Sequence, residues 1–138
     1  MSSSNDQHSP LRQGVVAVIE RGEQFLVIRR SEHVIAPLRL CFPGGGIEPG
    51  ESEPVALRRE VEEELGVAVN PVEKIWECIT PWRVNIAWWR ATLQGSARLV
   101  PNPDEVAEVL WMSLDEMHAS DELLESNHDF LKHLAAAR

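Results

Sequence analysis

The chain has 138 residues and a formal net charge of −9. This length fits one domain with its own core, and the acidic excess argues against duplex nucleic acid, which is bound through Lys and Arg. The two cysteines, the lack of an apolar N-terminal segment and the lack of a membrane-length apolar run predict a cytoplasmic protein with reduced thiols and no membrane partner.

The first part of the chain is predicted to be a tail followed by two strands. Residues 1–11 are polar and are expected to form a flexible N-terminal tail, with a single domain over residues 12–138. Apolar runs at residues 15–19 and 25–28 flank a turn around Gly22, which predicts a hairpin of two buried strands.

A glycine-rich loop then leads into a helix that is rich in acidic residues. Ser52 can cap this helix and Gly66 can end it, so we expect a helix over residues 53–65. Its apolar residues form one stripe along the helix. Three carboxylates occupy the neighbouring arc: Glu60, Glu63 and Glu64.

These three like charges repel one another, so their arrangement costs stability unless a cation lies among them. Oxygen ligands of this kind suit Mg²⁺ or Mn²⁺. Because Mg²⁺ keeps part of its shell for water and substrate phosphate, the expected partner is a small polyphosphate. The alternative is a solvated glutamate-rich helix face without a metal.

Two long strands follow the helix. We expect them at residues 67–80, with a break near Pro71, and at residues 84–93. Alternation places Trp88 and Trp89 on opposite faces of the sheet. One is expected in the core and the other to stack on a base, and Trp88 is the candidate for stacking.

The end of the chain is predicted to form a strand and two helices. Residues 106–111 form the strand, and Ser113 with Glu116 forms a capping box that opens a short helix. The last helix is expected to begin after a Ser126 cap and to continue through about Ala136.

The spacing of the glycine loop and the acidic helix resembles the complete signature of the Nudix hydrolases, in its MutT-type form. Gly45 is followed after five residues by Glu51, and seven residues later by the run Arg59 to Val67. This resemblance implies an α/β fold, the Nudix α/β/α sandwich with a mixed β-sheet between helices. It also implies a divalent metal and a substrate in which a nucleoside diphosphate is linked to another group.

The resemblance assigns roles to the acidic helix. It makes the metal ligands the carbonyl oxygen of Gly45 and the carboxylates of Glu60, Glu63 and Glu64. Arg59 is expected to pair with Glu51 and so to hold the loop against the helix. One of the helix glutamates, or Glu105 in the loop before the last strand, would take the proton of the attacking water. A solvent-exposed loop acid is the alternative for Glu105.

Further contacts are implied with the nucleotide. Arg29 and Arg30 end a strand on opposite faces, so at most one should point into the site, and the resemblance makes Arg30 the phosphate contact. It makes Phe42 part of the base pocket and Asn127 a hydrogen-bond partner of the base. Phe42 is equally compatible with the core, and Asn127 with a helix cap.

The implied reaction is the hydrolysis of a phosphoric anhydride. We expect a (d)NTP pyrophosphohydrolase that releases the monophosphate and pyrophosphate. The alternatives are an ADP-ribose or nucleotide-sugar pyrophosphatase, for which Pro81 lies near a proline of that group, an RNA-decapping enzyme, and a nucleotide-binding module without turnover. The five histidines show no metal-binding spacing, and the oligomeric state stays open.

Overall fold

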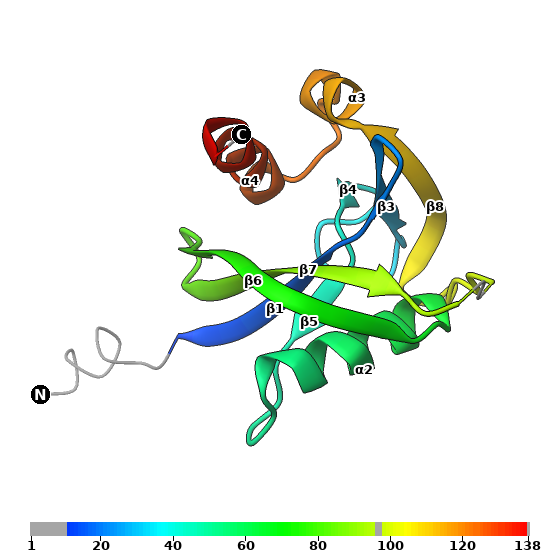
Figure 1. Cartoon of the computed structure of the whole chain (residues 1–138), viewed down its shortest axis with the longest axis vertical. Helices are drawn as coiled ribbons and strands as arrows, with labels where there is room; N and C mark the ends of the chain where they lie inside the picture. The colour runs from blue at the N-terminus through cyan, green and yellow to red at the C-terminus, as the bar shows by residue number, and fades with distance from the viewer. Residues whose placement is uncertain (1–10, 96–97, 138) are drawn as a thin grey trace, which may run out of the picture.

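The computed structural model describes residues 11–95 and 98–137 (Figure 1). Residues 1–10 of the predicted tail lie outside this part of the chain. The elements of the described residues are β1 Arg12–Val18, β2 Glu20–Arg21, β3 Gln24–Arg30, β4 Leu40–Cys41, β5 Gly44–Gly46, α2 Glu53–Leu65, β6 Val69–Ile79, β7 Val84–Leu93, β8 Val106–Ser113, α3 Leu114–Ala119 and α4 Glu125–Ala137.

The first sheet has the strand order β5-β1-β7-β6 and is mixed. β1 and β7 are parallel, whereas β1 pairs with β5, and β6 with β7, in the antiparallel sense. The predicted break in the first long strand is present as a register shift between Pro71 and Glu73. This sheet carries the glycine strand β5 at its edge, directly beside β1.

The second sheet is built around β3, which pairs antiparallel with β2, β4 and β8. The predicted hairpin is therefore only partly correct. Its turn is present, but only the short strand β2 pairs with β3, while β1 pairs with β5 and β7 in the other sheet. The chain therefore passes from the first sheet to the second after Val18.

Helices cover both sides of the sheets, which confirms the predicted α/β/α sandwich (Figure 1). Alternate residues of β1 serve the two layers: Val15 and Ala17 pack in the core under α2, whereas Val18 packs with Phe130 and Leu131 of α4. None of the helices in the described ranges has the length and apolar character needed to cross a membrane.

The acidic helix α2 has the predicted bounds. The hydroxyl of Ser52 accepts a hydrogen bond from the Val55 N–H, and Gly66 ends the helix in the left-handed conformation with φ 65°. Leu57, Val61 and Leu65 are fully buried. The apolar stripe thus anchors α2 on the first sheet and fixes the direction in which its glutamates point.

Of the caps predicted for the last two helices, the first is confirmed and the second is wrong. The capping box at Ser113 and Glu116 is confirmed. The cap at Ser126 is wrong, because α4 starts at Glu125 and the N–H groups of Asn127 and His128 both donate to the Leu124 carbonyl, at 3.0 and 3.1 Å. The start of α4 is set by main-chain bonding between Leu124 and Leu40 of β4, at 2.9 Å, rather than by a capping side chain.

Candidate active site

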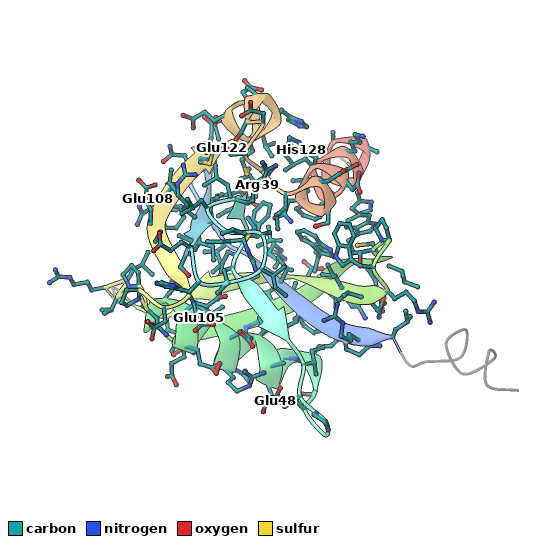
Figure 2. All side chains as sticks on the ribbon, turned by 180° about the vertical axis from the view of Figure 1, so that it is seen from behind. Arg39, Glu48, Glu105, Glu108, Glu122 and His128 are labelled. Carbon is teal, nitrogen blue, oxygen red and sulfur yellow. The ribbon has the colours of Figure 1, made fainter. Side chains whose placement is uncertain are left out.

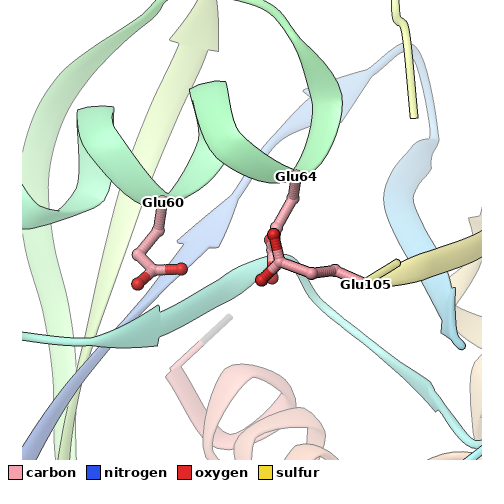
Figure 3. Close-up of side chains that lie close together, drawn as sticks. All are labelled: Glu60, Glu64 and Glu105. Carbon is pink, nitrogen blue, oxygen red and sulfur yellow. The ribbon is translucent and has the colours of Figure 1, made fainter. Parts of the chain in front are cut away.

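Three carboxylates from two separate parts of the chain meet beside β5. Glu60 and Glu64 project from α2, and Glu105 enters from the residue before β8 (Figure 3). One carboxylate oxygen of each lies within 4.8 Å of the others. Such an all-oxygen donor set fits a hard divalent cation of the Mg²⁺ type.

Glu63 lies outside this group of three. Its carboxylate, which is 44% exposed, accepts hydrogen bonds from Arg59 Nη1 at 3.0 and 3.2 Å. The structure thus brings the loop acid Glu105 to the position beside Glu64, whereas Glu63 remains a predicted ligand one helical turn from Glu60.

The glycine strand allows the acids to approach the sheet closely. A Cβ on Gly45 would overlap with the carboxylate of Glu60, so only glycine leaves room for that side chain. The N–H of Gly44 donates to Glu64 Oε1 at 3.0 Å. β5 therefore fixes two of the three carboxylates, one by close packing and one by a hydrogen bond.

The carbonyl of Gly45 does not fit its predicted role as a metal ligand. Gly45 stands opposite Val15, and the hydrogen bonds on either side of it in the β1–β5 ladder show that this pair is hydrogen-bonded. Its carbonyl oxygen consequently faces β1 and not the acids, since both main-chain groups of such a residue point to the partner strand.

Burial and mutual repulsion raise the pKa values of two carboxylates of the cluster, Glu60 and Glu64. Burial, followed by the nearby charge of Glu60, raises the pKa of Glu64 well above its ordinary value. Burial also raises the pKa of Glu60, although Arg59 opposes the effect. Ionising these carboxylates together is thus unfavourable without a cation, which is the condition that a bound divalent ion reverses.

Arg59 holds the loop and the helix together, as predicted. Its guanidinium forms two hydrogen bonds to Glu51, at 2.7 and 2.9 Å, and one to the carbonyl of Gly46 at 2.9 Å. The same group donates to Glu60 at 3.0 Å. These bonds raise the pKa of Arg59 and make it a permanent cation at the rim of the cluster.

A cavity of about 290 Å³ lies on the other side of β5. Its walls come from β1, β4, β5, the start of β7 and the start of α4. No Asp or Glu of the described residues lines it, despite the acidic chain. A second space, called the acidic cleft, is lined by Glu60, Glu64 and Glu105. The cavity and the acidic cleft share Arg30 and the three glycines of β5, so they meet along that strand.

The two arginines at the end of β3 point to different places. Arg30 lines both the cavity and the acidic cleft, and its Nε donates to the Ile35 carbonyl at 2.8 Å. Arg29 forms ion pairs with Glu108 and Glu122, both at 3.0 Å, and Figure 2 labels these two acids on one side of the molecule. Of the two, only Arg30 lines these spaces, which agrees with the prediction that at most one of them points into the site.

Trp88 is not available to a base, so this predicted contact is wrong. Its ring is fully buried and stacks on Phe130 with a centroid distance of 4.4 Å. Trp89, on the opposite face, donates from Nε1 to Glu53 at 2.8 Å. Trp88 faces α4, which covers that face of the sheet completely at this point.

Phe42 and Asn127 both border the cavity and are joined by a hydrogen bond. The Phe42 ring packs edge-on against Phe25, Trp88 and Phe130, so its side chain belongs to the core. Asn127 is buried, and its Oδ1 accepts from the Phe42 N–H at 2.9 Å. The alternative of a helix cap for Asn127 is wrong, since it lies within α4.

Several residues of the site were not predicted from the sequence. Gly14, Val84 and Ile86 line the cavity, and so does Cys41, where burial raises the pKa of the thiol to about 11. Gly14, at the start of an apolar strand, is a sequence signal that could have indicated this wall, because such a glycine often marks close approach of a ligand or backbone.

Comparison with known proteins shows the family of this chain. The NUDIX domain model matches residues 10–134. The NAD-capped RNA hydrolase NudC of Stutzerimonas stutzeri is 29% identical over 114 residues, which are 82% of this chain and 41% of the relative. The peroxisomal coenzyme A diphosphatase NUDT7 of Mus musculus is 27% identical over 131 residues, which are 86% of this chain and 56% of the relative. The chain thus spans only about two fifths to just over half of these relatives.

Solved structures share the fold. The MutT protein from Methanosarcina mazei superposes with a TM-score of 0.80 at 24% identity, covering 94% of this chain and 96% of that one. The E. coli ORF135 protein gives a TM-score of 0.74 at 24% identity, with 94% and 91% covered. With the signature in place, the acids assembled beside β5 and the family model matched over residues 10–134, the chain belongs to the Nudix family of hydrolases, which act on phosphoric anhydride bonds.

Proposed function

We propose that the chain is a cytoplasmic, Mg²⁺-dependent pyrophosphohydrolase of (d)NTPs that releases a nucleoside monophosphate and pyrophosphate. The observation that carries this proposal is that the acidic cleft and the cavity share Arg30 and β5. A volume of about 290 Å³ suits one nucleoside. With the base in this cavity, the phosphates would lie along the glycine strand towards the acids.

The metal is proposed from the donor set. Glu60, Glu64 and Glu105 offer carboxylate oxygens in one place, and Glu63 is retained as a further ligand. Mg²⁺ is favoured, with Mn²⁺ as a possible substitute. Such an ion supplies neutralisation of the diphosphate and orientation of a water.

The protein side chains have distinct proposed tasks. Arg30 has no hydrogen bond to a carboxylate among the described residues, its Nη1 lying only against Cys41 Sγ at 3.7 Å. Its guanidinium can therefore bind a phosphate. A glutamate of the cluster accepts a proton from the water while the water oxygen bonds to phosphorus. The bond from that phosphorus to the bridging oxygen of the leaving phosphate group breaks in the same step.

Asn127 is proposed to recognise the base through its amide nitrogen. Its oxygen is already used by the Phe42 N–H, and its Nδ2 donates to Ser126 Oγ at 3.2 Å. The amide carries a second N–H, which is proposed to donate to an acceptor on the edge of the base. This proposal is supported by the position of Asn127, which lines the cavity.

The relatives favour a second candidate, the hydrolysis of a larger nucleoside diphosphate derivative. NudC is named for NAD-capped RNA, and NUDT7 for coenzyme A. ADP-ribose and nucleotide sugars belong to the same chemical class. Capped RNA agrees less well with the net charge of −9, since an RNA chain needs cations for its phosphates. A binding module without turnover agrees less well with the three assembled acids.

Turnover of a nucleotide panel with Mg²⁺ tests the proposal. The panel contains canonical and oxidised dNTPs, ADP-ribose, nucleotide sugars, NAD, coenzyme A and capped RNA, with chromatographic separation of the products. We expect dNTP cleavage to monophosphate and pyrophosphate, and a loss of about 10³-fold in kcat for Glu64→Gln, because about 4 kcal/mol of electrostatic stabilisation disappears.

The matched control is Glu62→Gln, an exposed glutamate of the same helix, which should keep parental activity. Preferential cleavage of another panel member would replace the dNTP assignment with that substrate. Nucleotide binding without turnover of any member would reject the catalytic proposal in favour of the binding module.

A further inference from the structure

Asn102 forms hydrogen bonds both to the carboxylate of Glu105 and to the main chain of Glu64. We propose that Asn102 is a positioning residue that joins the end of α2 to the carboxylate of Glu105 and so sets the spacing between Glu64 and Glu105. This inference rests on the proposed metal-binding role of the three acids. It concerns residues that lie outside the signature stretch.

The main chain of Asn102 is bonded to the helix that carries the other acids. Its N–H donates to the carbonyl of Glu64 at 2.9 Å, and two residues earlier the Val100 N–H donates to the carbonyl of Leu65 at 2.7 Å. These bonds satisfy two of the carbonyls that a helix end leaves without partners. The segment before β8 is thereby fastened to the C-terminal end of α2.

Gly66 makes this attachment possible. A Cβ on Gly66 would stand 3.1 Å from the Cβ of Val100, which is tighter than ordinary packing. The glycine of the signature therefore has a second use besides the left-handed turn, because its missing side chain leaves room for the segment that carries Asn102. The position of Glu105 depends on this contact through the short connection that follows.

The side chain of Asn102 holds the turn and the carboxylate. Its Oδ1 accepts from the Asp104 N–H at 3.1 Å, and its Nδ2 donates to Glu105 Oε2 at 3.2 Å. Its carbonyl accepts from the N–H groups of Glu105 and Val106, at 3.0 and 2.8 Å. One residue thus contacts the backbone of Glu64 and the carboxylate of Glu105.

Ser31 anchors the same turn from the other side. It is 3% exposed, its hydroxyl donates to the Asp104 carbonyl at 2.8 Å, and its N–H donates to the Glu105 carbonyl at 3.0 Å. Both of these bonds end on backbone atoms of the turn, so Ser31 supports the backbone and not the carboxylate of Glu105. Asn102 and Ser31 therefore separate two functions, orientation of the acid and stability of the turn.

The donor of Asn102 offsets the repulsion between neighbouring acids. Glu105 is half-buried beside Glu60 and Glu64, and a carboxylate without a fixed partner would turn towards solvent. The amide occupies one oxygen and leaves the other for a ligand. Outer partners of this kind typically change metal affinity or activity by 10–100-fold when they are removed.

A double-mutant cycle tests the role of Asn102 in the full chain. The variants are Asn102→Ala, Glu105→Gln and the two combined, and the dissociation constant of Mn²⁺ is measured by electron paramagnetic resonance without nucleotide. We expect Asn102→Ala to weaken Mn²⁺ binding by about 10-fold or more and to add little in the Glu105→Gln background, because both changes disable the same carboxylate.

Two further variants separate positioning from stability. Ser31→Ala should lower the melting temperature while changing Mn²⁺ affinity less than Asn102→Ala does, and Asn70→Ala, at an exposed position of β6, should change neither. Additive effects of Asn102→Ala and Glu105→Gln, or equal effects of Asn102→Ala and Ser31→Ala on Mn²⁺, would overturn the inference.

Absence of Mn²⁺ binding by the parent protein would also overturn it. A parent that binds Mn²⁺ but hydrolyses no nucleotide would reject only the proposed function, so the two failures are distinguishable.

Discussion

The acidic cleft and the cavity lie on two sides of β5 and share Arg30, but different parts of the chain form them. Two of the three acids in the cleft come from one helix, at positions 60 and 64. The cavity takes its walls from β1, the segment 41–46, the start of β7 and the start of α4. In the proposed function, the metal ligands thus come mainly from one local element, whereas the cavity that would select a substrate is formed by the packing of several elements.

The two spaces also differ in charge. Burial and mutual repulsion raise the pKa values of Glu60 and Glu64 in the cleft, whereas the cavity has Arg12 and Arg30 and no acid of the described residues in its walls. Under the proposed function, the phosphates and the nucleoside of one substrate would therefore meet opposite environments. Separate substitutions should affect the chemical step and the binding step independently.

The strongest test breaks the cleft alone, through Gly45→Ala. The new Cβ would overlap with the Glu60 carboxylate, and the end of this flexible side chain would move while the fold is kept. A displacement of about 1 Å costs about 10²-fold in rate, so kcat in the turnover assay should fall by about that factor with an unchanged melting temperature.

Gly46→Ala is the steric control, because a Cβ there would meet only the Gln13 carbonyl, at 4.0 Å. It should have a much smaller effect on kcat. Equal losses for both substitutions would show that β5 tolerates no side chain anywhere and that the close approach to Glu60 is not the cause.

A smaller effect is expected when the cavity alone is changed by Gly14→Ala. The added methyl group would stand 3.6 Å from Val84 Cγ1 and 3.5 Å from the Gly45 carbonyl, so it fits without strain but narrows the wall. We expect KM for purine dNTPs to rise by about tenfold, as one carbon in a pocket typically changes it, with kcat near the parent value.

Steady-state kinetics with purine and pyrimidine dNTPs checks this prediction, since the smaller base should be less affected. A fall in kcat at constant KM would mean that Gly14 influences the acids through β5 instead of the base.

The smallest expected effect is a pH-dependent change in melting temperature for Glu51→Gln, since Glu51 holds Arg59 beside the acidic cleft. Hydrogen bonds from Arg59 and from the main chain of Glu48 lower the pKa of Glu51 from 4.5 to about 2. Because the folded-state pKa lies below the unfolded-state value, this stabilisation is complete above about pH 4.5 and disappears as the pH falls towards about 2. The difference in melting temperature between the parent and Glu51→Gln should therefore shrink over this interval.

Thermal unfolding at a series of pH values measures this dependence, with Glu62→Gln as the control for the loss of one exposed charge. A difference between the parent and Glu51→Gln that stays constant down to about pH 2 would contradict an ionic role for Glu51.

The sequence by itself determined the elements whose signals are local. The bounds of α2 follow from Ser52, Gly66 and a regular apolar stripe, and all three lie within the helix or directly at its ends. The pairing of Arg59 with Glu51 is equally local, since the loop and the helix are adjacent in the chain. The signature identified the family for the same reason.

The tertiary structure alone decided which of two opposite faces of an element is buried and which side chains are accessible. Alternation placed Trp88 and Trp89 on opposite faces, but only the packing of α4 shows that Trp88 is enclosed by Phe130. Phe42 and Asn127 were ambiguous for this reason also, and their mutual bond joins residues 85 positions apart. Periodicity states that faces differ and does not state what covers each one.

The acid cluster combines both levels. The helical period placed Glu60 and Glu64 on one arc, but the entry of Glu105 requires a segment 40 residues away to lie against the end of α2, through Asn102 and the space left by Gly66. Long-range contacts of this kind depend on the packing of the whole domain and leave no spacing in the sequence. The helix sequence therefore predicted the proposed metal chemistry, whereas the position of the third carboxylate, Glu105, was decided only by the fold.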